Sequence, residues 1–214
     1  EYAPPYHVLS ITNFMDILFR TTKSPKQSMK RALELIQKAI ALDDSYALAH
    51  GFLGFLYSWL GKYEEGIVEA QKGVALDPNG AHGYLYLSMV YRFAGRDEES
   101  VQAIEKAIRL NPFPPNTYFR DACRAYTIVG RYEEAIAAGE KAVTLSPDDY
   151  QAHLSLAMAY SSAGRQEEAR IEAAEVLRLI PKFSSARFAK IAPFRSQADR
   201  ENYIKALRKA GLPE

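Results

Sequence analysis

Cysteine is nearly absent from this sequence: Cys123 is the only one among 214 residues. A single cysteine cannot form a disulfide within the chain, and it cannot supply several thiolates to one metal ion. Scarce cysteine favours a reducing compartment, so we expect a cytoplasmic protein.

Long apolar runs and an excess of one charge are absent as well. No run approaches the roughly 20 apolar residues that cross a bilayer, and no basic and then apolar leader precedes the body of the chain. Lys and Arg total 27 and Asp and Glu total 26, which gives a net charge of +1. Such a balance exerts no general attraction on polyanions. We therefore expect no nucleic-acid partner and no membrane insertion.

The remaining composition is typical of a folded protein with a sizeable core, since 48% of the residues are hydrophobic and 25% are charged. The first residues are Glu-Tyr-Ala-Pro-Pro, without a methionine. This start predicts that the chain is a piece of a longer protein.

A short motif recurs four times at an almost constant interval. It consists of a glycine, a basic residue, any residue, two glutamates and a small residue, and it begins at Gly61, Gly95, Gly130 and Gly164. Successive motifs are therefore 34, 35 and 34 residues apart. Pro78, Pro112, Pro147 and Pro181 keep the same register. A fixed period of this length is the signature of a repeat protein.

Each repeat has the pattern of two helices. In the unit at 45–78, apolar residues at helical spacing precede Gly61, and a second periodic run ends before Pro78. Glycine at the left-handed position closes a helix, and proline cannot continue one. Glu64 and Glu65 then fall in the first turn of the second helix, where the helix dipole favours negative charge.

Aligned positions of the repeats hold small or aromatic residues where two helices meet. A small residue is followed three positions later by tyrosine in every first helix, and a second small residue recurs in every second helix. The three columns are Gly54, Ser88, Cys123 and Ala157; Tyr57, Tyr91, Tyr126 and Tyr160; and Gly66, Ser100, Ala135 and Ala169. Facing small residues let two helices approach closely.

These columns resemble the tetratricopeptide repeat (TPR) family, whose pattern is matched at most marks in four consecutive units. The resemblance implies an all-α, right-handed superhelical solenoid of about five helix pairs, which acts as a non-catalytic protein-protein interaction scaffold. The predicted units of this continuous domain are a degenerate leading repeat at 1–44, repeats at 45–78, 79–112, 113–147 and 148–181, and C-terminal capping helices at 182–214.

The tail is similar to the ends of TPR regions in bacterial multidomain signalling proteins. The similar segments are 183–190 and 203–214, together with the degenerate first unit. The relatives in question join TPR units to a class III adenylate or guanylate cyclase domain, or to a winged-helix domain. This resemblance implies an alternative function, a regulatory or dimerisation segment of a nucleotide cyclase, although no cyclase catalytic segment is present.

No residue pattern predicts catalysis, a metal site or a cofactor. The paired glutamates recur at equivalent, solvated places, whereas acid/base chemistry needs carboxylates in different environments that converge on one cleft. The four histidines include no pair at i, i+4 spacing, and no histidine is near Cys123 in sequence. The glycines lack the spacing of a nucleotide-binding loop. We expect a chain that is not an enzyme.

A further stripe of side chains lies on the first helices, away from the packing columns. It is aromatic in the second and third units and polar in the fourth and fifth, and in the TPR family such stripes line the peptide-binding groove. The predicted groove residues are Leu48, Phe52, Phe55, Trp59, Tyr86, Met89, Phe93, Arg120, Arg124 and Met158. The groups that the TPR carboxylate clamp uses are not matched here.

This stripe predicts a partner peptide with apolar anchors and a carboxylate, because Arg120 and Arg124 add a basic step to the groove. The alternative is packing between helices or between two copies of the chain. In that case the leading helix, with Phe14, Ile17 and Leu18, folds across the aromatic half, and a homodimer becomes the expected assembly.

Overall fold

The computed structural model describes residues 2–19, 21–191, 193, 195 and 197–213, and these residues form helices and loops without a strand. The helices are α1 (Ala3–Leu18), α2 (Pro25–Leu42), α3 (Ala47–Trp59), α4 (Tyr63–Leu76), α5 (Ala81–Phe93), α6 (Asp97–Leu110), α7 (Asn116–Ile128), α8 (Tyr132–Leu145), α9 (Tyr150–Ser162), α10 (Gln166–Leu179), α11 (Ser185–Ile191) and α12 (Gln197–Lys209).

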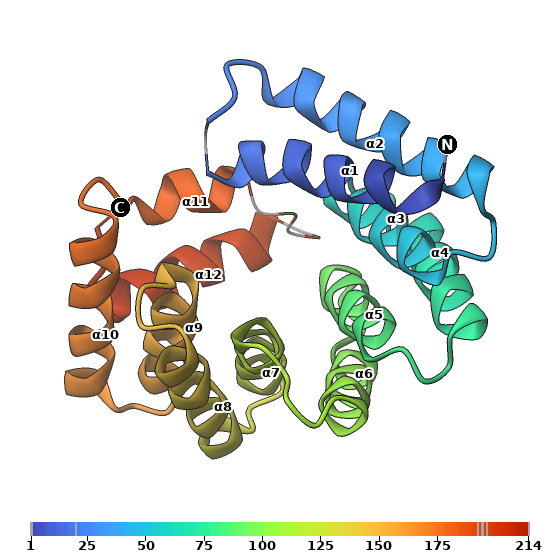
Figure 1. Ribbon diagram of the computed structural model, residues 1–214. Coiled ribbons are helices and arrows are strands. Elements are labelled where there is room, and N and C mark those ends of the chain that lie inside the picture. Colours follow the sequence, from blue (N-terminus) through green and yellow to red (C-terminus); the bar gives the residue numbers. More distant parts are fainter. Residues whose placement is uncertain (1, 20, 192, 194, 196, 214) are drawn as a thin grey trace.

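Consecutive helices pack as pairs, and the pairs follow one another around a curve (Figure 1). From α1 to α10 the odd-numbered helices lie on the inner side of the curve and the even-numbered helices on the outer side. The prediction of an all-α, right-handed superhelical solenoid of about five helix pairs with a C-terminal cap is confirmed.

Glycine ends each inner helix from α3 to α9. Gly61 has a φ of 78° and Gly130 a φ of 80°, in the left-handed region that side chains with a Cβ rarely adopt. This turn lets the Lys62 amide donate to the carbonyl of Tyr57 at 2.9 Å, which closes the end of α3. The Arg131 amide closes α7 in the same way on Tyr126, also at 2.9 Å. The glycine of the recurring motif is therefore a helix terminator.

The two helices of a pair cross at the predicted small-residue columns. A Cβ added to Gly54 of α3 would lie 2.5 Å from the Gly66 carbonyl oxygen of α4. The equivalent pair in the next unit, Ser88 and Ser100, lies 3.1 Å apart between hydroxyl oxygens. Such spacing leaves no room for larger side chains, so close backbone packing sets the shape of each pair.

The C-terminal helices turn back into the curve. Figure 1 shows α12 on the inner side of the solenoid, where it contacts α9. Leu207 of α12 is fully buried in a cluster with Leu154 and Val176. The Arg195 guanidinium donates to the carbonyl of Ala94 at the end of α5, at 3.0 Å. Ala192 and Phe194, between α11 and α12, lie outside the described residues.

The crossing of α3 and α4 predicts opposite effects of one substitution at two glycines. Gly54→Ala places its Cβ against backbone atoms, 2.5 Å from the Gly66 oxygen, and should destabilise the fold by about 1–3 kcal/mol. Gly83 is the matched control, because it is also a buried helical glycine but its added Cβ meets only Val74, at 3.6 Å. Gly83→Ala should be neutral or gain up to about 1 kcal/mol. Urea unfolding compares the variants, and equal midpoints would contradict this account.

Candidate functional site

The aromatic stripe lies at the seam where the inner helices α1, α3 and α5 meet. The Phe14 ring of α1 makes edge contacts with Phe55 and Trp59, with centroids 5.1 and 4.9 Å apart. On the other side of α3, Phe52 lies 5.7 Å from the Tyr86 ring of α5. The leading helix therefore packs across the aromatic half of the stripe.

Burial separates the predicted groove residues into two sets. The side chains of Phe52, Phe55 and Tyr86 are 2%, 8% and 8% exposed, so they face neighbouring helices instead of an open surface. The reason is geometric, since residues at i, i+4 and i+7 of an inner helix point at the inner helices on either side. The other predicted groove residues are half-buried: Leu48, Trp59, Met89, Phe93, Arg120, Arg124 and Met158.

The seam becomes polar between α7 and α9. The Arg120 guanidinium donates to Asp149 at 2.6 Å, and Arg124 Nε donates to the Ser155 hydroxyl at 2.8 Å. Both predicted basic residues thus hold neighbouring helices together.

A third arginine, which the sequence analysis did not single out, connects α5 to α7. The Arg92 guanidinium donates to Asp121 at 2.9 Å, and Asp121 also accepts from the Ser88 hydroxyl at 2.9 Å. Asp121 is 1% exposed, so its charge depends on these partners. No short sequence pattern joins Arg92 to Asp121, because they lie in different repeats.

The C-terminal helix covers the far end of the predicted groove. Met158 of α9 and Tyr203 of α12 both pack against the apolar cluster that includes Leu207 of α12. Burial raises the pKa of the Tyr203 phenol, while the positive charges of Arg124 and Arg92 oppose that rise. The phenol of α12 thus lies within electrostatic reach of the polar seam.

The charged residues of the recurring motif pair with one another. Arg96 donates to Glu99 at 2.8 and 2.6 Å, and its guanidinium lies 4.9 Å from the Tyr91 ring centroid. The hydrogen bond from Arg96 lowers the pKa of Glu99, and Arg131 does the same for Glu134. A general acid at neutral pH needs the opposite shift.

Burial raises the pKa of the Cys123 thiol to about 12, which keeps it protonated. Among the described residues, no group of three His, Cys, Asp or Glu side chains is placed to hold a metal ion. In the same part of the chain, no helix combines the length and apolar character needed to cross a membrane.

His7 fastens α1 to α3 from within the core. Its Nδ1 lies 3.0 Å from the Tyr46 hydroxyl, and its ring packs against Phe52 with centroids 5.6 Å apart. The ring is 5% exposed, and Nε2 is buried without a hydrogen-bond partner among the described residues. Burial lowers the pKa of His7 to about 4, with the charge of His82 as a smaller cause.

Comparison with known proteins identifies the repeats. Family models described as tetratricopeptide repeat match residues 81–114 and 128–191. The chain contains tetratricopeptide repeats. None of the curated proteins matches this chain.

Solved TPR structures share the fold. A thermophilic TPR protein, TTC0263 of Thermus thermophilus, is 22% identical and superposes with a TM-score of 0.68 over 95% of this chain and 98% of its own. YrrB, described as a TPR protein with an unusual peptide-binding site, is 22% identical, with a TM-score of 0.56 over 82% of this chain and 90% of its own.

A third match is the Cut9–Hcn1 hetero-tetramer of APC/C, at 17% identity and a TM-score of 0.72, over 98% of this chain and 36% of that chain. At these identities the likeness establishes the fold alone. The predicted link of the TPR tail to a nucleotide cyclase stays a prediction, because these matches do not bear on it.

His7 predicts a loss of stability in mild acid. Its pKa is lowered from 6.5 to about 4 in the folded chain, so the unfolded chain binds more protons between these values. The free energy of unfolding should fall by on the order of 3 kcal/mol as the pH drops from about 6.5 to about 4. The variant His7→Gln should lose much of this slope in urea unfolding at a series of pH values. Identical slopes in both proteins would contradict the assignment.

The Arg92–Asp121 pair predicts a strong penalty when one partner is removed. Arg92→Met leaves the buried Asp121 carboxylate without its cation and should cost on the order of 3–5 kcal/mol. The double variant Arg92→Met/Asp121→Leu should recover most of that loss, because no uncompensated charge remains. Thermal and urea unfolding of the two single variants and the double variant measure the coupling. Additive losses would mean that the two side chains act independently.

Proposed function

We propose that this chain is a non-catalytic TPR scaffold that binds a peptide or a partner protein on the inner side of its curve. One observation supports this more than any other: Trp59 and Phe93 meet in an edge contact at 5.9 Å and remain half-buried after α1 has packed. The guanidinium of Arg92 lies 4.7 Å from the Phe93 ring centroid. Aromatic rings beside arginine are the groups that dominate binding energy at protein interfaces.

The ligand surface in this proposal is shorter than the whole predicted stripe. Helix α1 covers Phe52 and Phe55, and α12 packs on Met158. What remains is the middle of the inner face, with Trp59, Met89 and Phe93 as apolar anchors and Arg92 and Arg124 as hydrogen-bond donors. Peptide binding by YrrB, another TPR protein, is consistent with this use of the fold.

The second candidate is a dimerisation or regulatory segment of a larger signalling protein, such as a nucleotide cyclase. The observation that favours it is a set of exposed apolar residues on α1 and at its C-cap, where Val8, Leu9 and Phe19 are 60%, 49% and 62% exposed. Exposed apolar residues on one helix face are typical of interaction surfaces. On this account a homodimer forms through α1, in the cytoplasm.

Peptide selection tests the scaffold function. Peptides selected on the wild-type chain from a random library should lose at least about tenfold in affinity when Trp59→Ala or Arg124→Glu is introduced. Arg109→Glu and Val68→Ala are the matched controls, because both side chains are exposed on the outer helices and should leave binding unchanged. Unfolding curves verify that each variant is folded. Equal affinity of the selected peptides for the wild type, Trp59→Ala and Arg124→Glu would contradict the proposed surface.

Sedimentation at two concentrations separates the second candidate from the first. A concentration-dependent dimer that Phe19→Asp abolishes would favour the dimerisation segment. A monomer at both concentrations, together with peptide binding, favours the scaffold.

A further inference from the structure

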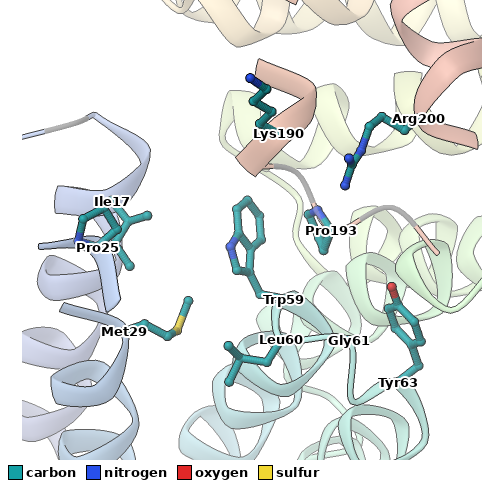
Figure 2. Close-up of a pocket in the computed structure, with 10 residues that line it drawn as sticks. All are labelled: Ile17, Pro25, Met29, Trp59, Leu60, Gly61, Tyr63, Lys190, Pro193 and Arg200. Atoms are coloured by element: carbon teal, nitrogen blue, oxygen red, sulfur yellow. The ribbon is translucent and has the colours of Figure 1, made fainter. Parts of the chain in front are cut away.

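A pocket of about 440 Å³ remains where the leading helices and the C-terminal segment come together (Figure 2). Its walls come from the leading helices α1 and α2, from the end of α3 and the turn after it, and from the C-terminal segment that includes α11 and α12. Neither helix pairing nor the inner-helix seam fills this space. Its volume is in the range of ligand pockets.

One side of the pocket is apolar. Ile17 of α1 and Met29 of α2 line it, and the Trp59 indole stands between them and the C-terminal segment in Figure 2. Trp59 is half-buried, and its indole N–H donates no hydrogen bond to any described residue. The ring therefore offers both an apolar face and an unused donor to a ligand.

The opposite side carries positive charge. Lys190 of α11 and Arg200 of α12 line the pocket, and neither makes an ion pair or a hydrogen bond within the part of the chain that the structure describes. Figure 2 shows the Arg200 guanidinium turned toward the pocket and Lys190 at its rim. None of the described lining residues is Asp or Glu.

Among the described lining residues, no acidic side chain opposes the positive charge on this side. Two cations at one cavity repel each other, and the positive potential that they share attracts an anion. Arg200 also lies in the first turn of α12, where the helix dipole disfavours a positive charge. Both effects make a bound carboxylate favourable at this rim.

We propose that this pocket binds a peptide segment in which a large apolar side chain stands next to an acidic side chain. The apolar group packs on Trp59, Ile17 and Met29, and the carboxylate accepts hydrogen bonds from Arg200 and Lys190. The inference rests on the proposed peptide-binding function and adds the chemical class of the partner. Because the pocket joins the leading helices to the C-terminal segment, its occupant also bridges the two ends of the solenoid.

Trp59 is the only tryptophan in the chain, so its fluorescence reports directly on this pocket. The test titrates the intact chain with the capped peptide acetyl-Ala-Glu-Phe-Ala-amide, which contains neither tryptophan nor tyrosine. The expected result is a saturable change in Trp59 emission. Replacing Glu by Gln or Phe by Ala in the peptide should each weaken binding by about tenfold, because each removes one half of the recognised pair.

Variants of the chain test which cation binds the carboxylate of the peptide. Arg200→Gln should weaken the binding of the Glu peptide by about tenfold and leave the affinity for the Gln peptide unchanged. Lys190→Gln should also weaken the binding of the Glu peptide, but by a smaller factor. Arg187→Gln is the matched control, since Arg187 is an exposed cation on α11 that does not line the pocket. Its affinity for the Glu peptide should equal that of the wild type.

Three outcomes of these titrations would overturn the inference. The Glu and Gln peptides bind with equal affinity, or Arg200→Gln changes affinity no more than Arg187→Gln does, or acetyl-phenylalanine with a free carboxylate binds whereas the capped Glu peptide does not. A further contrary result is that selected peptides bind Arg124→Glu more weakly than the wild type but bind Arg200→Gln with unchanged affinity. That result would exclude this pocket as their binding site and leave the broader scaffold function in place. The two proposals can therefore fail separately.

Discussion

Close approach of two helices at small residues is the constraint on which the rest of this structure depends. Where α3 crosses α4, the space between Gly54 and Gly66 does not admit a methyl group. Since each pair is held at such short range, its outer and inner surfaces are fixed, and the next pair can stack only in one orientation. Curvature and the existence of an inner face follow from that repeated crossing.

The inner helices meet along a seam whose chemistry changes along the chain. Rings fill it between α1, α3 and α5, whereas hydrogen-bonded ion pairs such as Arg92–Asp121 and Arg120–Asp149 fill it from α5 to α9. Burial of apolar area stabilises the aromatic seam. A buried ion pair stabilises the fold little more than two apolar residues would, but the loss of one partner is strongly destabilising. Ion pairs between neighbouring inner helices thus distinguish the second half of the solenoid from the first.

Helix α1 and the C-terminal segment both lie on the inner side of the curve. Helix α1 covers the aromatic rings of α3, and the C-terminal segment reaches across to the carbonyl of Ala94 at the end of α5. An open TPR array would offer its whole inner face to a partner. Here the chain itself covers part of that face at both ends, so the ligand surface that we propose is limited to its middle and to the pocket beside Trp59.

The amino-acid sequence by itself determined the repeat period, the helix pairs, the terminating glycines and the small-residue columns. All of these arise from local rules, since a left-handed glycine or a helical apolar spacing acts over a few residues. The glutamate pairs were likewise correctly interpreted as helix-start residues. Only the tertiary structure decided which stripe residues face solvent. That Phe55 is buried by Phe14, that Arg92 pairs with Asp121, and that Arg200 comes to the same pocket as Trp59 depend on contacts between residues far apart in the chain. A sequence period places side chains on a helix face, but the neighbour that covers this face is chosen by packing of the whole solenoid.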